Sequence, residues 1–300
     1  LNIFGIHTAQ FSCSSKYLAI GNDSYDKSKG QIKIYDISNS FEFLYSFDVD
    51  NCITTLNFFG NDRFLLAHTR VPLEKEFTEA YIFDLSDNFK KVFTFSEDTC
   101  SYSFTSDGKY LAIREQNSKK ITIYNPLEDF KIFKEIEQTM EIINFTFEKN
   151  GKYFICTIGN GNNEERNLNI YEPIYDFSLL EVIIDAPEFS RIEFFDNKLI
   201  LFGYEVYYFY QKYNDKFELD NKIEESGDPF ISNDEKYFVL TDYKTIKIYD
   251  LENMNELVCE FEEKYSGVIW DASFHKGSKY LCIAFNDNLI VYDVDRSIDL

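Results

Sequence analysis

Two carboxylates in this chain, Glu193 and Asp271, are of the residue type that binds metal ions. Alternation within their predicted strands places Glu193 and Asp271 on the same side as a row of small polar residues, with Arg191 close to Glu193. A metal-dependent hydrolase needs several oxygen ligands that converge on one point, usually including more than one carboxylate. An ion pair with Arg191 explains the same residues more simply. We therefore expect a salt bridge here, and we keep a metal-dependent hydrolase or lactonase as an alternative.

Histidine offers no second route to catalysis. His7, His68 and His275 belong to three different segments of the chain, so neither a triad nor a histidine-based metal site can be argued from them. The chain also lacks the G-x-S-x-G, H-E-x-x-H and P-loop motifs. We expect a protein without catalysis, cofactor or bound metal, in which each histidine has a structural or surface role.

The elements that carry these residues come from an internal repeat. The segment Asp107–Ile113 has near copies along the whole chain, and a period of about 43 residues is typical of solenoids, propellers and arrays. In most copies an aromatic residue stands six positions before the marker residue, which itself follows Lys or Arg. The marker residues are Tyr17, Phe64, Tyr110, Tyr153, Leu199, Tyr237 and Tyr280.

Each repeat predicts four short strands. The segments between turn residues are rich in aromatic and β-branched side chains, and the turns carry Gly, Asn, Asp and Ser. Four strands in about 43 residues is the size of a propeller blade. The sequence therefore predicts an all-β fold, a seven-bladed β-propeller of four-stranded antiparallel blades, with residues 1–300 as one domain.

The repeat resembles the WD40 and WD40-like propellers over the whole chain. Thr105-Ser106-Asp107-Gly108-Lys109 is similar to the turn between that family's first two strands. The third strand ends in Tyr-Asp, as at Tyr249-Asp250, where the family has Trp-Asp, and the family's Gly-His pair is absent. The buried network of that His and Trp is replaced, we expect, by packing of Tyr and Phe between blades.

We expect a strand from one of the two ends of the chain to complete the seventh blade. Leu1–Phe4 occupies the place that an outermost strand holds in the other repeats, so we predict that it completes the seventh blade. The alternative uses Ile298–Leu300 as that strand. Closure of a propeller removes sheet edges that would otherwise pair with other chains.

The composition of the chain indicates its cellular compartment and the class of its partners. The six cysteines form no C-x-x-C pair, and five of them lie at or in predicted strands of different blades, which is typical of buried thiols in a reducing compartment such as the cytoplasm. A net charge of −22 disfavours nucleic acid and anionic membranes as partners, because both require Lys and Arg. The chain begins at Leu1 without an initiator Met, so we expect it to be part of a longer protein.

Acidic residues recur in the links from each outer strand to the next inner strand, and propeller geometry gathers these links on one face. We predict partner-binding roles for Asp48, Asp50, Glu97, Asp98, Glu137, Glu188, Asp228 and Glu262, with Phe77 from the long loop of the second repeat. Lys16, Arg63, Lys109, Lys152, Lys198, Lys236 and Lys279 are expected on the opposite face. Carboxylates around a channel mouth attract basic segments.

We interpret the chain as a protein-interaction scaffold, monomeric as an isolated domain, whose acidic face binds a partner with a basic segment. Two alternatives remain from the sequence. One is the propeller hydrolase or lactonase with its site at the central channel around Glu193 and Asp271. The other is a purely structural module of a larger protein or assembly.

Overall fold

The computed structural model describes residues 6–12, 14–23, 29–50, 52–70, 78–97, 99–115, 118–148, 151–160, 166–189, 191–195, 198–214, 216–232, 235–242, 245–253, 256–262, 269–274, 280–285 and 288–293. The chain divides into two compact units, Leu1–Ala186 and Pro187–Leu300, and each is described by itself. Among the described residues, no helix has the length and apolar character that crossing a bilayer requires.

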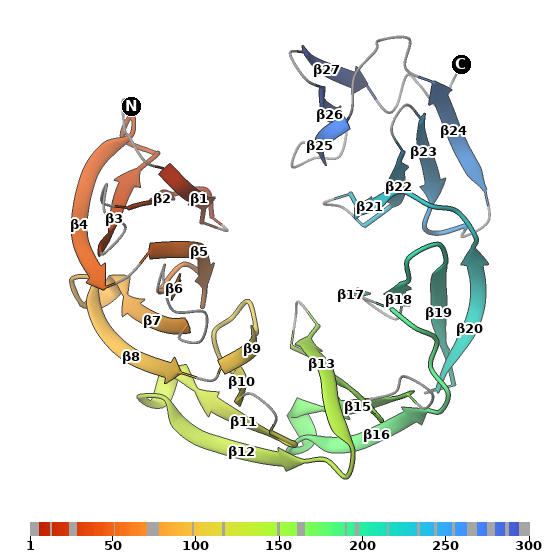
Figure 1. Cartoon of the computed structure of the whole chain (residues 1–300), viewed down its shortest axis with the longest axis horizontal. Helices are drawn as coiled ribbons and strands as arrows, with labels where there is room; N and C mark the ends of the chain where they lie inside the picture. The colour runs from red at the N-terminus through yellow and green to blue at the C-terminus, as the bar shows by residue number, and fades with distance from the viewer. Residues whose placement is uncertain are drawn as a thin grey trace. The chain divides into compact units, whose positions relative to one another are not determined.

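The first unit holds four antiparallel sheets of four strands, each joined in sequence order (Figure 1). The first blade comprises β1 (Ile6–Phe11), β2 (Tyr17–Asp23), β3 (Lys29–Asp36) and β4 (Glu42–Asp50). The second comprises β5 (Cys52–Phe59), β6 (Phe64–Arg70), β7 (Thr78–Asp84) and β8 (Lys90–Glu97). The third comprises β9 (Thr99–Phe104), β10 (Leu111–Glu115), β11 (Lys120–Asn125) and β12 (Lys131–Glu137). The fourth comprises β13 (Glu141–Phe147), β14 (Phe154–Gly159), β15 (Arg166–Glu172) and β16 (Ser178–Ile183).

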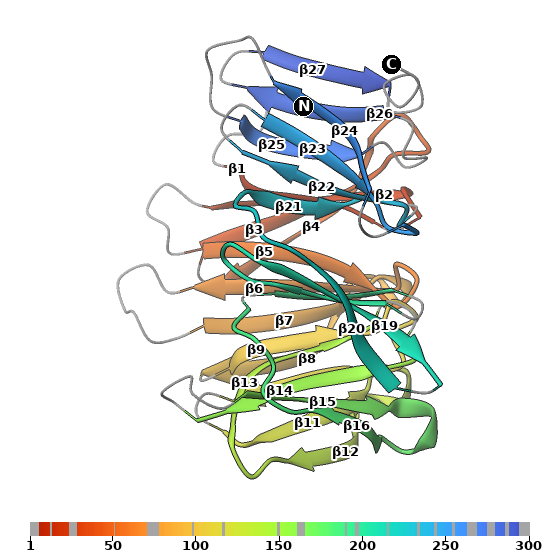
Figure 2. The same ribbon diagram turned by 90° about the vertical axis from the view of Figure 1, so that its right-hand side faces the viewer.

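The second unit holds three further sheets. The fifth blade comprises β17 (Arg191–Phe195), β18 (Lys198–Phe202), β19 (Tyr207–Tyr213) and β20 (Lys216–Ile223). The sixth comprises β21 (Asp228–Ile231), β22 (Tyr237–Thr241), β23 (Thr245–Asp250) and β24 (Leu257–Glu262). The seventh sheet has three strands within the described residues, β25 (Ile269–Phe274), β26 (Tyr280–Phe285) and β27 (Asn288–Asp293), which lie side by side in Figure 2.

Within the described residues, the structure therefore confirms the all-β fold and the predicted repeat register for six four-stranded antiparallel blades. The strand proposed to complete the seventh blade, Leu1–Phe4, and its alternative, Ile298–Leu300, both lie outside the described residues. Closure by the N-terminal strand and the single domain over 1–300 stay predictions.

The order of strands gives every four-stranded blade two different ends. Because neighbouring strands are antiparallel, the turns between the first and second strands and between the third and fourth strands lie at the same end, the turn end. The loop between the second and third strands and the link to the next blade lie at the other end, the link end.

The first turn of the third blade folds as its sequence predicts. The Thr105 hydroxyl donates to Oδ1 of Asp107 at 2.6 Å, and that same oxygen accepts the Lys109 backbone N–H at 2.9 Å. The Tyr110 N–H donates to the Thr105 hydroxyl oxygen at 3.1 Å. Ser12 and Ser232 hold the corresponding turns of the first and sixth blades with their hydroxyl oxygens. A Ser or Thr before the first turn thus stabilises that turn in these three blades by accepting a backbone hydrogen bond.

Glycine is required where two of these turns meet. Gly108 has a φ of +73°, and a Cβ at that position would lie 2.5 Å from the Cα of Gly60 in the preceding blade. The Asn61 N–H donates to the Ser106 carbonyl oxygen at 3.0 Å across the same boundary. The turn ends of the second and third blades are therefore in direct backbone contact.

The core lies between neighbouring blades and is largely aromatic. The marker residues Phe64, Tyr110 and Tyr153 are buried, each less than 5% exposed. One apolar cluster joins the second and third blades and another joins the third and fourth. A further cluster joins the fifth and sixth blades. The expected replacement of the His and Trp network by Tyr and Phe packing is confirmed.

Three phenylalanines in the turns before the outer strands connect one blade to the preceding one. Phe89, Phe130 and Phe177, the turn phenylalanines, follow the short 3₁₀ helices η1 (Leu85–Asp87), η2 (Pro126–Glu128) and η3 (Pro173–Tyr175). All three have left-handed backbone, with φ of 58°, 55° and 56°, which an aromatic residue adopts only when packing compensates.

Each turn phenylalanine contacts a ring of the blade before it. Phe89 stacks on Tyr45 with 4.8 Å between ring centroids, and Phe130 stacks on Phe93 at 4.6 Å. Phe177 lies 5.2 Å from Tyr110, which belongs to the third blade. This feature was not predicted from the sequence, although an acidic or amide residue, four further residues and Phe recur before the outer strands of the first four blades.

Replacement of Phe177 with Ala is expected to lower the free energy of unfolding by about 3 to 5 kcal/mol, because a 4% exposed ring that bridges two blades is lost. Urea unfolding followed by fluorescence measures this. Ile174→Ala in the same turn is the control, since Ile174 is 75% exposed and its loss should change stability little. Equal losses in the two variants would contradict a connecting role for Phe177.

Candidate functional site

The structure places the predicted acidic residues at the link ends of their blades. Asp48 and Asp50 lie at the end of β4, Glu97 and Glu137 are the last residues of β8 and β12, and Glu262 is the last residue of β24. Glu188 lies between β16 and β17, and Asp228 begins β21. Asp98 and Phe77 lie outside the described residues. The placement agrees with the expected topology, whereas a binding role for these residues stays a prediction.

Asp48 and Asp50 line a pocket of about 200 Å³ between the first and second blades. Lys91, the second residue of β8, also lines the pocket, although β8 begins at the turn end of the second blade. Lys29, the first residue of β3, lies on the same wall. Both aspartates are exposed, and the Gln31 side-chain amide donates to Asp48 at 3.0 Å. The pocket thus presents carboxylates within reach of lysines.

The inner wall of this pocket is the ring of Tyr81, which is 5% exposed. Its hydroxyl donates to the Glu79 carboxylate, and the Lys91 ammonium lies 4.9 Å from the ring centroid. Burial, the bond to Glu79 and the charge of nearby Asp50 all raise the pKa of Tyr81. The hydroxyl therefore stays protonated and acts as a hydrogen-bond donor at neutral pH.

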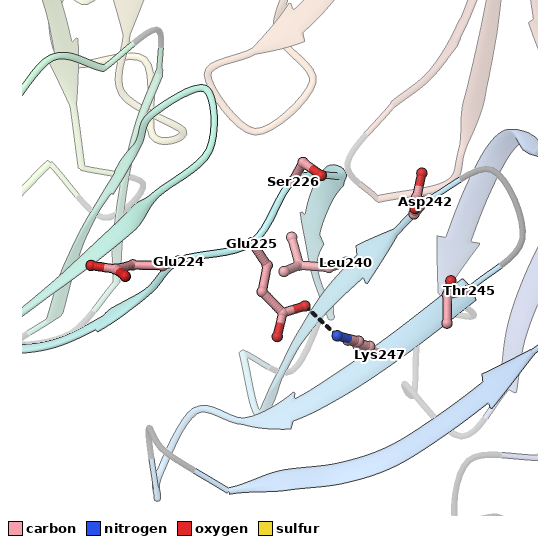
Figure 3. A pocket seen from close by; sticks show the side chains of 7 residues that line it. All are labelled: Glu224, Glu225, Ser226, Leu240, Asp242, Thr245 and Lys247. Carbon is pink, nitrogen blue, oxygen red and sulfur yellow. Dashed lines mark hydrogen bonds and ion pairs between the residues drawn. The ribbon is translucent and has the colours of Figure 1, made fainter.

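The second unit has a larger pocket, of about 520 Å³, at the link between the fifth and sixth blades (Figure 3). The link contributes Glu224, Glu225 and Ser226, and the sixth blade contributes Leu240, Asp242, Thr245 and Lys247. Figure 3 shows the Glu225 carboxylate directed at Lys247, while Glu224 points away from them. Two of the three carboxylates, those of Glu224 and Asp242, belong to exposed residues.

Glu225 is held on two sides. It forms an ion pair with the Lys247 ammonium and accepts a hydrogen bond from the Tyr249 hydroxyl at 3.0 Å. The bond and charge of Glu225 raise the pKa of Lys247, and burial followed by the bond to Glu225 raises the pKa of Tyr249. The Lys247 ammonium is therefore engaged in an intramolecular ion pair, and its two partners hold the carboxylate of Glu225 in place.

The same three positions form a polar contact in the fourth blade. The Gln138 side-chain amide, in the link from the third blade, donates to the Tyr171 hydroxyl at 2.8 Å, and the Asn169 amide donates to Gln138 at 3.0 Å. Asn169 stands two residues before Tyr171, as Lys247 stands two residues before Tyr249. The aromatic-acid endings of these third strands, Tyr171-Glu172 and Tyr249-Asp250, signalled both tyrosines, but their partners were not identified from the sequence.

The predicted separation of charge between the two ends is only partial. Lys109 and Lys152 lie at turn ends, where their ammonium groups lie 5.0 Å from the ring centroids of Tyr110 and Tyr153. Lys29 and Lys247, however, line the pockets that contain the link carboxylates. The link ends therefore combine acidic residues with a few lysines, such as Lys29 at the start of β3 and Lys247 near the start of β23.

The carboxylate considered for metal chemistry, Glu193, is engaged by Arg191. The Nε atom of Arg191 lies 3.5 Å from Oε1 of Glu193, so the expected salt bridge is confirmed for this pair. The Arg191 guanidinium also donates to the Pro229 carbonyl oxygen at 3.3 Å and lies 4.2 Å from the ring centroid of Phe202. Asp271 lies in β25, whose side chains are outside the described set. Within the part of the chain that the structure describes, no group of three potential metal ligands occurs.

His68 has the structural role that the sequence predicted. It lies in β6, and its Nδ1 is 3.1 Å from the Thr54 hydroxyl oxygen. Burial lowers the pKa of His68, because the charged imidazolium would lose its hydration. The neutral form is therefore favoured at neutral pH.

The comparisons with known proteins concern the fold. No protein-family model matches the chain, and no curated protein matches it either. The β-propeller domain of Cps50 (Swd1) from Myceliophteria thermophila is 11% identical, with a TM-score of 0.62 over 98% of this chain and 97% of that one. The C-terminal WD40 domain of Sif2 is 12% identical, with a TM-score of 0.67 over 95% of this chain and 79% of that one.

A third similar structure is an enzyme. The dihydro-heme d1 dehydrogenase NirN, solved in complex with DHE, is 12% identical, with a TM-score of 0.68 over 98% of this chain and 65% of that one. At these identities the likeness concerns the fold alone, and a fold shared with an enzyme does not decide between binding and catalysis. The chain has the WD40-like β-propeller fold.

Replacement of Glu225 with Gln is expected to lower the stability of the second unit by about 1 kcal/mol, because two partly buried partners lose a charged acceptor. Thermal unfolding measures the loss. Glu224→Gln is the matched control, since Glu224 and its partner Lys222 have side chains 63% and 54% exposed and their pair should contribute little. A larger loss in Glu224→Gln would refute the role assigned to Glu225.

The lowered pKa of His68 predicts a pH-dependent stability. Below the ordinary histidine pKa of 6.5 the unfolded chain takes up a proton that folded His68 resists, so this residue lowers stability as pH falls. We expect the melting temperature of His68→Gln to decrease less than that of the wild type between pH 7.5 and 5.5. Parallel decreases in the two proteins would show that His68 does not contribute.

Proposed function

We propose that this chain is a protein-interaction scaffold without catalytic activity of its own, and that its link ends bind a basic segment of a partner protein. The observation that carries the proposal is that exposed carboxylates from the link ends line a pocket in each unit. Asp48 and Asp50 line one pocket, and Glu224 and Asp242 line the other.

The geometry of the pockets supports recognition of Lys or Arg side chains. A cavity of about 200 Å³ in the first unit and one of about 520 Å³ in the second can accept a long side chain. The buried rings of Tyr81 and Phe83 offer an apolar surface for its methylene groups, and Asp48 and Asp50 offer acceptors for its charge. Phe77, which stands between β6 and β7 in the sequence, is proposed as an additional apolar contact.

Charge and cysteine chemistry support the remaining parts of the proposal. A net charge of −22 favours basic protein partners over nucleic acid and anionic membranes, and it opposes self-association, so the isolated domain is proposed to be monomeric. Cys156 and Cys259 are free thiols, and burial raises the pKa of Cys156 to about 12. Unreactive free thiols suit a reducing compartment, and we propose the cytoplasm.

The test reverses charge at the link ends. The variant with Asp50, Glu97 and Glu137 changed to Lys is expected to bind a lysine-rich peptide about tenfold more slowly, with a weaker dependence of the association rate on salt. Stopped-flow fluorescence with a labelled peptide at several ionic strengths provides the measurement.

The control reverses the same number of charges at the turn ends. Glu42, Asp87 and Glu128 are exposed acidic residues at the turn ends of the first three blades, and changing them to Lys gives the same net charge. If the two triple variants lose association rate equally, only net charge matters and the link ends are not the site. If neither variant differs from the wild type, the proposed function is wrong.

A further inference from the structure

We propose that the turn ends of the third and fourth blades form a second protein-binding surface, which takes an acidic segment anchored by an apolar side chain. This surface lies within the first unit, at the end opposite to the carboxylate pocket, and it is independent of the function proposed above. Three observations carry the inference: an exception within the repeated turns, a pocket beside it and two exposed lysines.

The exception is the tip of the turn in the fourth blade. In the first and second blades the two residues at the tip are Ser38-Asn39 and Ser86-Asp87, and in the third they are Leu127-Glu128. The fourth blade has Ile174-Tyr175, which are 75% and 66% exposed. The second blade forms the same 3₁₀ turn with polar residues, so folding does not require apolar ones here. Large apolar side chains exposed together indicate an interaction surface.

A pocket of about 300 Å³ lies directly beside this tip. Ile174 forms one wall, the first turn of the third blade forms another with Thr105 and Tyr110, and Gly151 of the fourth blade closes it. Gly151 has a φ of +71°, and a Cβ there would lie 2.9 Å from a methyl carbon of Thr105. The Thr105 side chain therefore packs directly against Gly151, which leaves no room for a larger residue at this edge of the pocket.

The charged groups of the pocket are two lysines and one aspartate. Lys109 and Lys152 are exposed, and each ammonium group lies 5.0 Å from the centroid of the following tyrosine ring, an arrangement that holds it at the pocket. Oδ1 of Asp107 accepts bonds from the Thr105 hydroxyl and the Lys109 N–H within the turn. The carboxylate of nearby Asp176 pairs with Lys134 at 2.6 Å.

The charges of the pocket indicate which class of peptide it can bind. Exposed ammonium groups beside an apolar wall complement a segment that carries both carboxylates and an aliphatic or aromatic side chain. Because the protein as a whole carries a charge of −22, its long-range field repels such a segment, and binding must depend on the apolar contact. A basic segment would gain nothing from Lys109 and Lys152.

The experiment uses a labelled peptide in which leucine and phenylalanine alternate with glutamate and aspartate, measured by fluorescence anisotropy on the full chain. Ile174→Ser combined with Tyr175→Asp gives the fourth blade the tip of the second, so the variant should fold with an unchanged melting temperature. We expect its affinity for the peptide to fall at least about tenfold, as for the loss of an interface anchor.

Charge reversal tests the two lysines separately. Lys109→Glu and Lys152→Glu should each weaken binding by about twofold to fivefold, and Lys90→Glu at the turn end of the second blade should have no effect. A peptide with serine in place of its apolar residues, and one with lysine in place of its acidic residues, should not bind this surface.

Four results would overturn the proposal. They are the absence of binding by the acidic apolar peptide, equal binding by the wild type and the tip variant, and preference for the lysine peptide at this surface. The fourth is self-association of the wild type that the tip variant abolishes in sedimentation velocity, which would make a second copy of the chain the occupant.

Discussion

Packing of aromatic rings between neighbouring blades is the interaction on which the rest of this structure depends. A single four-stranded sheet cannot bury both of its faces, so each blade is stable only against its neighbours. Phe177 contacts rings of both the third and the fourth blades, within 5.2 to 6.1 Å of four of them. This packing holds a left-handed phenylalanine in a conformation that an isolated turn would not adopt.

Because of this packing, the turn end and the link end of a blade differ in how much their sequence can vary. At the turn ends, Gly60 and Gly108 meet at backbone distance and the turn phenylalanines enter the core, so both sequence and conformation are constrained. At the link ends, the packing of the core constrains the sequence less, because the link only has to connect one blade to the next. Contacts there are made by side chains that differ between blades, Gln138 with Tyr171 in one and Glu225 with Tyr249 in another.

The parts of the structure that depend on the repeat could be predicted from the sequence. The marker residues, the four-strand order and the turn around Thr105 follow from period and alternation, which recur with each copy. The salt bridge between Arg191 and Glu193 followed from their position on one side of a strand. The lysines that line the pockets, Lys91 and Lys247, could not be predicted, because the neighbouring blade that they approach is fixed by packing rather than by spacing.

Comparison of the repeat copies distinguishes residues that the fold requires from residues that it does not require. Phe177 and Ile174 are both apolar and stand in one turn, yet one is 4% exposed and the other 75% exposed. The counterparts of Phe177 are phenylalanine in the first three blades, whereas the counterparts of Ile174 include two serines. The copies of a repeat thus show which positions the common fold fixes. A departure at a position that the fold leaves free, such as Ile174, requires an explanation outside the fold, and contact with another molecule supplies one.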